Sequence, residues 1–336
     1  MDPTTDFKTM ADVKSITGVK SIADVKSITL DALETLRKKS LVDKEPFKAR
    51  AYKKVFDQIK GMDTFTENDI ERLQGAGEKI TAKLYEIMKT GQLASAEVAK
   101  TKYNMGALDA FQKIYGVGPV KAQQLVDAGI TSIIELREES KKNPALLNVN
   151  QRTGLQYYEP LLERIPYAEM QEHERMLLDV LYRADVSVSG TVVGSFRRGQ
   201  PDSGDIDFLV RGQLEMKSFV HVLKEEGYLV SVLAQGATKC MGISSVGVPR
   251  RLDILICPNE EYAYALLYFT GSQQFNIAFR QHALEMGYTM NEHGMKAVRA
   301  NVFAVPYMDR EEDIFDFLGL CYVSPKDRIN GKIVRK

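Results

Sequence analysis

The 336 residues are enough for two or three compact units with separate hydrophobic cores. Lys and Arg number 45, as do Asp and Glu, so the formal net charge is zero, which excludes a protein that binds nucleic acid mainly through long-range positive charge. No apolar run of 18 residues and no signal-peptide pattern occurs, and Cys240, Cys257 and Cys321 lie far apart, so we expect an intracellular protein with free thiols and without disulfides, a zinc site or membrane contact.

Residues 1–28 contain a short repeat, Val-Lys-Ser-Ile, at 13–16, 19–22 and 25–28. A period of six fits neither one face of a helix nor a strand with one buried side, and the segment has few large apolar groups to offset the entropy of ordering. We therefore expect a flexible leader over residues 1–28. Order is predicted to begin at Thr29, a suitable N-cap for a helix that carries Leu30, Leu33 and Leu36.

Periodicity predicts four helices from there to about residue 100, and two Gly-x-Gly turns join helices along the chain. The first turn contains Gly75 and Gly77, and the second contains Gly116 and Gly118. Both are typical of helix-hairpin-helix motifs, in which the unpaired N–H groups at a helix start donate to a DNA phosphate without reading bases. An ordinary turn that needs glycine for positive φ is the alternative interpretation.

Two lysines come after the first turn. Lys79 and Lys83 lie four residues apart on one helix, beside an apolar stripe of Ile80, Leu84 and Ile87. Neighbouring amines can lower each other's pKa, which an amine nucleophile toward an aldehyde requires. From periodicity alone, a solvated basic face is the better interpretation.

Residues 102–165 are predicted to be helical and to end before Pro166. The period then changes to that of strands, predicted at 186–189, 191–193, 205–210, 228–233 and 251–257, with a helix near 214–226. The segment before Arg250, with Gly242, Gly247 and Pro249, is predicted to be a short loop. This order of elements predicts an α+β fold.

Acidic residues stand on two of these strands. Asp205 and Asp207 project from one face, and Asp253 lies opposite the apolar residues that flank it on its strand. Upstream, the turn Gly194-Ser195 and the pair Arg197-Arg198 offer hydrogen-bond donors suited to a polyphosphate. A lone Asp-x-Asp is more often solvated, but three acids beside a phosphate cradle predict two Mg²⁺ ions and phosphoryl transfer.

The pattern Gly-Ser-x-x-Arg-x5-Gly-Asp-x-Asp resembles the palm of the nucleotidyltransferases, and in particular DNA polymerases of family X such as the beta and lambda enzymes. Two further segments strengthen the resemblance, Tyr268-Phe269-Thr270-Gly271-Ser272 and Ser324-Pro325-Lys326-Asp327-Arg328. It covers residues 29–328, leaves no room for a BRCT domain before them, and predicts a disordered basic tail after them.

The resemblance implies four folded parts after the leader of residues 1–28. They are an all-helical lyase-like domain with the first helix-hairpin-helix (29–101), a helical, fingers-type subdomain for duplex DNA with the second (102–165), a palm with the catalytic acids (166–257), and a small α/β nucleotide-selection subdomain with the tail (258–336).

The resemblance also assigns roles to residues. Asp205, Asp207 and Asp253 are the implied metal ligands and catalytic acids, and Lys83 is the implied Schiff-base lysine of a lyase. The implied nucleotide-binding residues are Arg164, Ser195, Arg198, Ser203, Gly204, Tyr268, Phe269, Gly271 and Asn276. The implied DNA-binding residues are Gly75, Gly77, Lys79, Gly116, Gly118, Arg251 and Arg280.

The implied function is gap filling from dNTPs by a template-directed DNA repair polymerase. The implied enzyme is a monomer that acts on gapped or nicked duplex DNA in the nucleus, with a viral or organellar setting as the alternative. It uses two Mg²⁺ ions that Mn²⁺ can replace and a monovalent cation at each hairpin, and its further implied partner is a repair ligase or scaffold protein. Lyase activity in base excision repair is expected beside it. Ala82 and Gln92-Leu93-Ala94-Ser95 depart from the family's lyase pattern, so an end-joining gap filler without lyase activity is the alternative. An RNA-tailing nucleotidyltransferase and a noncatalytic DNA-binding scaffold are the more distant alternatives.

Overall fold

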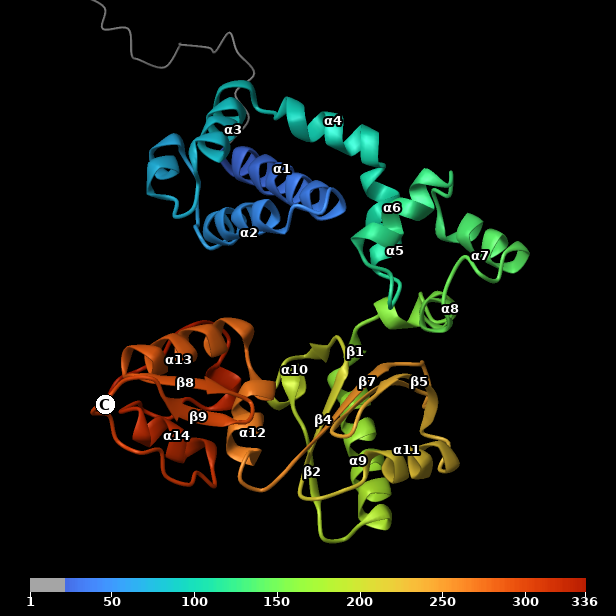
Figure 1. Ribbon diagram of the computed structural model, residues 1–336, viewed down its shortest axis with the longest axis vertical. Coiled ribbons are helices and arrows are strands. Elements are labelled where there is room, and N and C mark those ends of the chain that lie inside the picture. The colour runs from blue at the N-terminus through green and yellow to red at the C-terminus, as the bar shows by residue number, and fades with distance from the viewer. Residues whose placement is uncertain (1–21) are drawn as a thin grey trace, which may run out of the picture. The chain divides into compact units, whose positions relative to one another are not determined.

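Apolar residues spaced three and four apart make the first unit helical throughout. The structure is a computed structural model that describes residues 22–336, and the chain divides into the units Met1–Gln151 and Arg152–Lys336 (Figure 1). The elements of the first unit are α1 (Ile22–Val42), α2 (Pro46–Lys60), the 3-10 helix η1 (Glu67–Arg72), α3 (Glu78–Thr90), α4 (Ala94–Tyr103), α5 (Met105–Gln112), α6 (Pro119–Asp127) and α7 (Ile133–Lys142). The helix α8 (Val149–Gln156) crosses the division.

The first helix begins earlier than the sequence predicts. Ile22 opens α1, so the third Val-Lys-Ser-Ile copy is helical and the predicted leader boundary at residue 28 is wrong. Thr29 lies inside the helix, fully buried, and its hydroxyl donates to the Val25 carbonyl at 2.8 Å. The Lys26 amine donates to the carbonyls of Lys60 and Met62 at the end of α2, a tertiary contact that a six-residue period does not reveal. The part of the leader prediction that concerns residues 1–21 lies outside the described residues.

The second unit is built on a five-stranded sheet in the order β2-β4-β7-β6-β5. β4 and β7 are parallel and the other neighbours are antiparallel. Apolar residues of one sheet face, with Phe208 and Ile254 among them, pack against α9 and α11 (Figure 1). The elements are β2 (Ser189–Val192), β4 (Ile206–Arg211), β5 (Leu229–Gln235), β6 (Lys239–Ser244), β7 (Arg251–Cys257), α9 (Tyr167–Ala184) and α11 (Met216–Glu225).

Two strand predictions need correction. The sequence predicts a loop for the residues of β6, but this strand lies between β5 and β7 in the sheet. Gly242 stands inside the strand because a Cβ there would come within 2.6 Å of Leu229 Cδ1 and 2.8 Å of the Ser231 carbonyl oxygen. No strand forms at 186–188, because the Asp185 carboxylate accepts hydrogen bonds from the backbone and hydroxyl of Ser187 and turns the chain.

Short elements complete the unit around the sheet. A two-stranded ladder of β1 (Ile165–Pro166) and β3 (Asp202–Ser203) follows the 3-10 helix η2 (Pro160–Leu162), and the one-turn helix α10 (Gly194–Arg197) follows β2. A second apolar core joins α12 (Tyr262–Thr270), α13 (Gln273–Glu285), β8 (Tyr288–Asn291), β9 (Gly294–Ala297), α14 (Glu311–Phe317) and the segment around η3 (Pro325–Asp327).

The last residues are ordered against this core. The Cys321 amide donates to the Val334 carbonyl at 2.8 Å, and Leu320 forms a β-bridge with Arg335. The expected disordered tail is therefore wrong, because the backbone donors and acceptors of the tail are paired with residues 319–321. Among the described residues, no helix is both long enough and apolar enough to span a membrane.

Candidate active site

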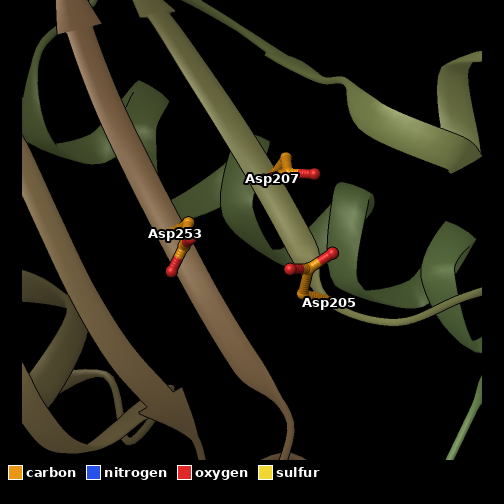
Figure 2. Close-up of side chains that lie close together, drawn as sticks. All are labelled: Asp205, Asp207 and Asp253. Atoms are coloured by element: carbon orange, nitrogen blue, oxygen red, sulfur yellow. The ribbon is translucent and has the colours of Figure 1, made fainter. Parts of the chain in front are cut away.

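Three carboxylates meet where β4 and β7 run side by side. Asp207 on β4 is directly opposite Asp253 on β7 in the parallel register, and Asp205 immediately precedes β4 (Figure 2). One oxygen from each carboxylate lies within 4.8 Å of the others. The neighbours Ile206, Leu252 and Ile254 point into the core, so strand alternation places the acids on the opposite face.

Burial makes this cluster electrostatically strained. Desolvation, reinforced by the negative charge of Asp253, raises the pKa of Asp207 to about 6. Desolvation also raises the pKa of Asp253, which the cation of Arg251 partly opposes. The Arg251 guanidinium contacts Asp205, and its Nε lies 3.9 Å from Asp253 Oδ1.

The cluster has the properties of a divalent cation site. Within the described part of the chain, Asp253 Oδ1 is buried and accepts no hydrogen bond, although the cation of Arg251 lies 3.9 Å away. Oxygen ligands of this kind and number are those that Mg²⁺ and Mn²⁺ prefer. The residues therefore fit a divalent cation.

A glycine makes room for one of the acids. Gly194 has φ +63°, and a Cβ there would lie 2.3 Å from Asp207 Oδ2. Only glycine combines that backbone conformation with such a close approach. The Gly-Ser turn singled out in the sequence therefore positions Asp207 in addition to offering donors.

The predicted phosphate cradle is assembled on the β1–β3 ladder. Ile165 pairs with Ser203, and Pro166 pairs with Asp202. The Ser195 hydroxyl donates to Ser203 Oγ at 2.8 Å. Arg164 precedes the ladder, and its Nε and Nη2 donate to Asp202 Oδ1 at 2.8 and 2.6 Å.

The two consecutive arginines of the motif have separate surroundings. Arg198 Nη1 donates to the Thr270 carbonyl at 2.5 Å and the residue lines the cleft described below. Arg197 is held by Glu311, with Nη2–Oε2 at 2.7 Å, and by the Thr270 hydroxyl at 2.6 Å. The sequence predicts that Arg197 offers its guanidinium to a polyphosphate, but its donors are already used inside the protein.

A cleft of about 850 Å³ runs from the acids across the cradle to α12, α13 and β8. Tyr268 and Phe269 form one wall, with their rings edge to face at 5.1 Å between centroids. The Asn276 side-chain amide donates to the Tyr268 carbonyl at 2.7 Å, which fixes the end of α12 against α13. Predicted site residues that line the cleft are Arg164, Gly194, Ser195, Arg198, Gly204, Asp205, Asp207, Tyr268, Phe269, Gly271, Asn276 and Arg280.

Three predicted residues of the second unit lie outside the lining of this cleft. Asp253 lines an adjoining hollow of about 30 Å³ together with Asp207 and Lys239. Ser203 is buried beneath Ser195, and Arg251 covers Asp205. Sequence reasoning missed Lys239, whose charge acts on both Asp207 and Asp253, because it lies on the unpredicted strand β6.

The predicted lyase residue and most of the predicted DNA-binding residues belong to the first unit. Gly75 and Gly116 have φ of +85° and +80°, so both turns require a residue with positive φ at these positions. Gly77 and Gly118 are the N-caps of α3 and α6 without a side-chain cap, so no capping side chain occupies the first N–H groups. On α3, Lys79 is exposed and Lys83 is half-buried.

Four family models match successive parts of the chain. They are a helix-hairpin-helix domain (residues 26–93), the fingers domain of DNA polymerase lambda (109–162), the DNA polymerase beta palm (164–259) and the DNA polymerase beta thumb (265–329). Similar curated proteins include DNA polymerase lambda of Rattus norvegicus, 29% identical over 326 residues, with 89% of this chain and 55% of the relative covered. DNA polymerase lambda of Arabidopsis thaliana is 27% identical over 307 residues, with 83% and 57% covered. The chain thus spans little more than half the length of these relatives.

Proposed function

Because the chain belongs to family X of the DNA polymerases, we propose that it transfers nucleotides from dNTPs to the primer 3′-hydroxyl of gapped or nicked duplex DNA, under the direction of a template. The observation that carries the proposal is the acid cluster. Three carboxylates with oxygens within 4.8 Å lie beside an 850 Å³ cleft whose rim bears Arg164, Ser195 and Arg198. Acids on one side and phosphate donors on the other suit a bound triphosphate.

Asp205, Asp207 and Asp253 would hold two Mg²⁺ ions, and Mn²⁺ is the expected substitute. When bound, such ions lower the pKa of an attacking hydroxyl and neutralise the charge of the triphosphate. The chain's own residues orient the substrate: Arg164, Ser195, Arg198 and the Gly204 backbone face the phosphates, while Tyr268, Phe269 and Gly271 bound the sugar and base. Arg251 would have to release Asp205 for that carboxylate to hold a metal ion, because its guanidinium contacts the same carboxylate.

The first test measures gap filling and sugar removal together. A one-nucleotide gapped duplex with a 5′-deoxyribose phosphate is incubated with the protein, Mg²⁺ and a labelled dNTP or NTP. Extension with the dNTP supports the proposal, and a preference for the NTP would favour an RNA-tailing enzyme. Asp253→Ala should lower turnover by about 10³-fold or more while gapped-DNA affinity stays within about threefold, and unchanged turnover would refute the assignment.

Lyase activity is the second candidate function. Its support is the match of residues 26–93 to a helix-hairpin-helix domain and the position of Lys83, half-buried on α3 one turn after Lys79. The Lys83 amine would attack the sugar aldehyde, with loss of water to a Schiff base. Loss of a proton from C2′ then breaks the C3′–O bond, so that the downstream strand leaves with a 5′-phosphate, and water releases the sugar from Lys83. Borohydride should trap a covalent adduct in the wild type and not in Lys83→Ala; adduct at full yield in the variant would exclude Lys83.

The pathway can be inferred from the same assay. Gap filling with sugar removal would place the protein in base excision repair, and gap filling alone would favour end joining. Duplex DNA is the proposed partner of both hairpins, each with a monovalent cation, and a repair ligase or scaffold protein is a further proposed partner. Monomeric state and nuclear residence stay predictions from the family resemblance.

A further inference from the structure

A buried arginine lies behind the phosphate cradle. Only 4% of the Arg250 side chain is exposed, and the residue immediately precedes β7. Its Nε and Nη2 donate to the two carboxylate oxygens of Glu169 on α9, at 2.7 and 3.0 Å. These hydrogen bonds hold the pKa of Glu169 below its usual range, so the pair is ionised at neutral pH. A buried guanidinium requires such a bidentate partner, because an unpaired charge in this position would be costly.

The remaining donor of Arg250 reaches the backbone that leads to Arg164. Nη1 lies 3.5 Å from the Pro160 carbonyl and 3.4 Å from the Glu163 carbonyl. These two carbonyls belong to the first residue of η2 and to the residue directly before Arg164. Arg250 itself is fixed to the sheet, since its amide donates to Ser244 Oγ at 3.1 Å and its carbonyl accepts from the Ser244 amide at 2.8 Å. The sheet therefore sets the backbone position of residues 160–163.

The phosphate cradle comes directly after this segment in the chain. Arg164 directly precedes the β1–β3 ladder that carries Asp202 and Ser203, and Ser203 Oγ accepts from the Ser195 hydroxyl. The Arg164 side chain is 59% exposed, so packing does not determine its direction. Its direction into the cleft therefore depends on its backbone and on Asp202.

We propose that Arg250 and Glu169 are positioning residues that set Arg164, and with it the cradle, for the triphosphate of the incoming nucleotide. The inference rests on the proposed function and deepens it, since it assigns the tuning of triphosphate affinity to an ion pair outside the cleft. Small displacements of a binding group can change rates by large factors. The effect should fall on nucleotide binding, because neither residue touches the acid cluster.

The test is a double-mutant cycle between Glu169→Gln and Arg164→Ala. Glu169→Gln keeps the side-chain size and removes the charge that fixes Arg250. Two readouts are used: the KM and kcat for one dNTP on gapped DNA, and the equilibrium affinity for inorganic tripolyphosphate with Mg²⁺. Glu172→Gln is the matched control, because it makes the same chemical change on α9, where Glu172 pairs with Arg175 on the surface, and leaves the contacts of Arg250 in place.

The expected result is non-additive. Glu169→Gln alone should raise the dNTP KM and the tripolyphosphate dissociation constant about tenfold, with kcat within about threefold of the wild type. In the Arg164→Ala background the same change should alter both by less than about twofold, because Arg164 is the residue through which it acts. Glu172→Gln should leave the KM, the tripolyphosphate dissociation constant and the melting temperature close to the wild-type values, because it breaks only an exposed pair.

Three outcomes count against the proposal or separate it from the proposed function. If Glu169→Gln lowers only the melting temperature, the pair is a structural contact. The same holds if the effects of Glu169→Gln and Arg164→Ala on KM are independent and multiply in the double variant. Either result overturns the inference, while gap filling stands. If the protein binds tripolyphosphate with the expected coupling but extends no primer, the proposed function fails and the inference holds. If the wild-type protein binds no tripolyphosphate and Glu169→Gln leaves the dNTP KM unchanged, the inference is overturned, while primer extension alone decides the proposed function.

Discussion

Gly194 shows how a single backbone conformation controls the position of one carboxylate of the acid cluster, that of Asp207. Its φ of +63° and the 2.3 Å approach of a Cβ to Asp207 Oδ2 both exclude a side chain. We expect Gly194→Ala to displace Asp207 and to reduce nucleotide incorporation by about 10²-fold or more, with a loss of about 1–2 kcal/mol in unfolding free energy from the left-handed conformation. Steady-state kinetics and urea unfolding measure the two effects. Activity near the wild-type value would show that the Asp207 carboxylate tolerates a different position.

The raised pKa of Asp207 predicts a pH dependence of stability in the metal-free protein. The carboxyl titrates near 3.8 when unfolded and near 6 when folded, so the folded state binds more protons between these values. The contribution of Asp207 to stability therefore falls as pH rises from about 4 to 6, by up to about 3 kcal/mol, and stays lower above that window, whereas Glu169 and Glu311, whose pKa values are lowered, contribute in the opposite direction. Urea unfolding in EDTA across this range measures the slope.

Asp207→Asn separates this effect from general acid destabilisation. The variant should lose the part of the pH dependence that comes from Asp207, measured as the difference between its curve and that of the wild type, and at neutral pH it should be more stable than the wild type. Asp63→Asn replaces an exposed carboxylate and is the control, with a slope like that of the wild type. Equal slopes in wild type and Asp207→Asn would contradict the assignment.

At the level of elements, a buried ion-pair cluster joins the one-turn helix after β2 to the C-terminal helices. Glu311 at the start of α14 is 2% exposed and accepts from Arg197 at 2.7 Å and from Arg328 at 2.6 Å. Burial alone would raise the pKa of Glu311, but the hydrogen bond from Arg197 and the charge of Arg328 hold it below its usual range. Arg328 also lies over the rings of Phe275 and Phe315.

Loss of Glu311 should leave two cations without their partner. We expect Glu311→Ala to cost about 3–5 kcal/mol of unfolding free energy, as for a broken buried pair. Asp316 lies on α14 together with Glu311 and forms an exposed pair with Lys336 at the C-terminus. Asp316→Ala should therefore cost less than about 1 kcal/mol of unfolding free energy. Chemical denaturation of both variants provides the comparison, and equal losses would mean that the cluster is no stronger than a surface pair.

The sequence predicts some of these elements well for physical reasons. The α+β fold class is confirmed, and the structure brings Asp205, Asp207 and Asp253 together because strand alternation and apolar neighbours fix their face. The strand β6 could not be predicted from the sequence, because Gly242 weakens the strand pattern. The glycine is needed because Leu229 and Ser231 of the neighbouring strand leave no room for a side chain, a contact that the sequence does not show. The pairs Arg197–Glu311 and Arg250–Glu169 span 114 and 81 residues, and no local pattern indicates partners at such separations.

For the whole molecule, the balance of 45 basic and 45 acidic residues restricts how DNA can be bound. A neutral chain gains little from counterion release unless it carries local cations, whereas backbone N–H groups at helix starts bind phosphates without adding charge. The hairpins before α3 and α6 offer such groups, and Lys79 adds an exposed cation beside the first. Two kinds of phosphate contact are therefore expected on one chain.

The salt dependence of gapped-DNA affinity distinguishes the two kinds. Lys79→Ala should weaken binding and reduce the slope of log affinity against log salt by about 0.9, the value for one phosphate contact. Gly116→Ala, where φ is +80° and a Cβ would lie 3.3 Å from Gln151 Cγ, should weaken binding at every salt concentration and leave the slope unchanged. Gly106→Ala on α5 meets only Asn104 Oδ1, at 4.0 Å, and is the control. If Gly116→Ala also reduces the slope of log affinity against log salt, the second hairpin binds phosphate through charge. The DNA affinity of this neutral protein would then come from basic patches and not from the backbone N–H groups at helix starts.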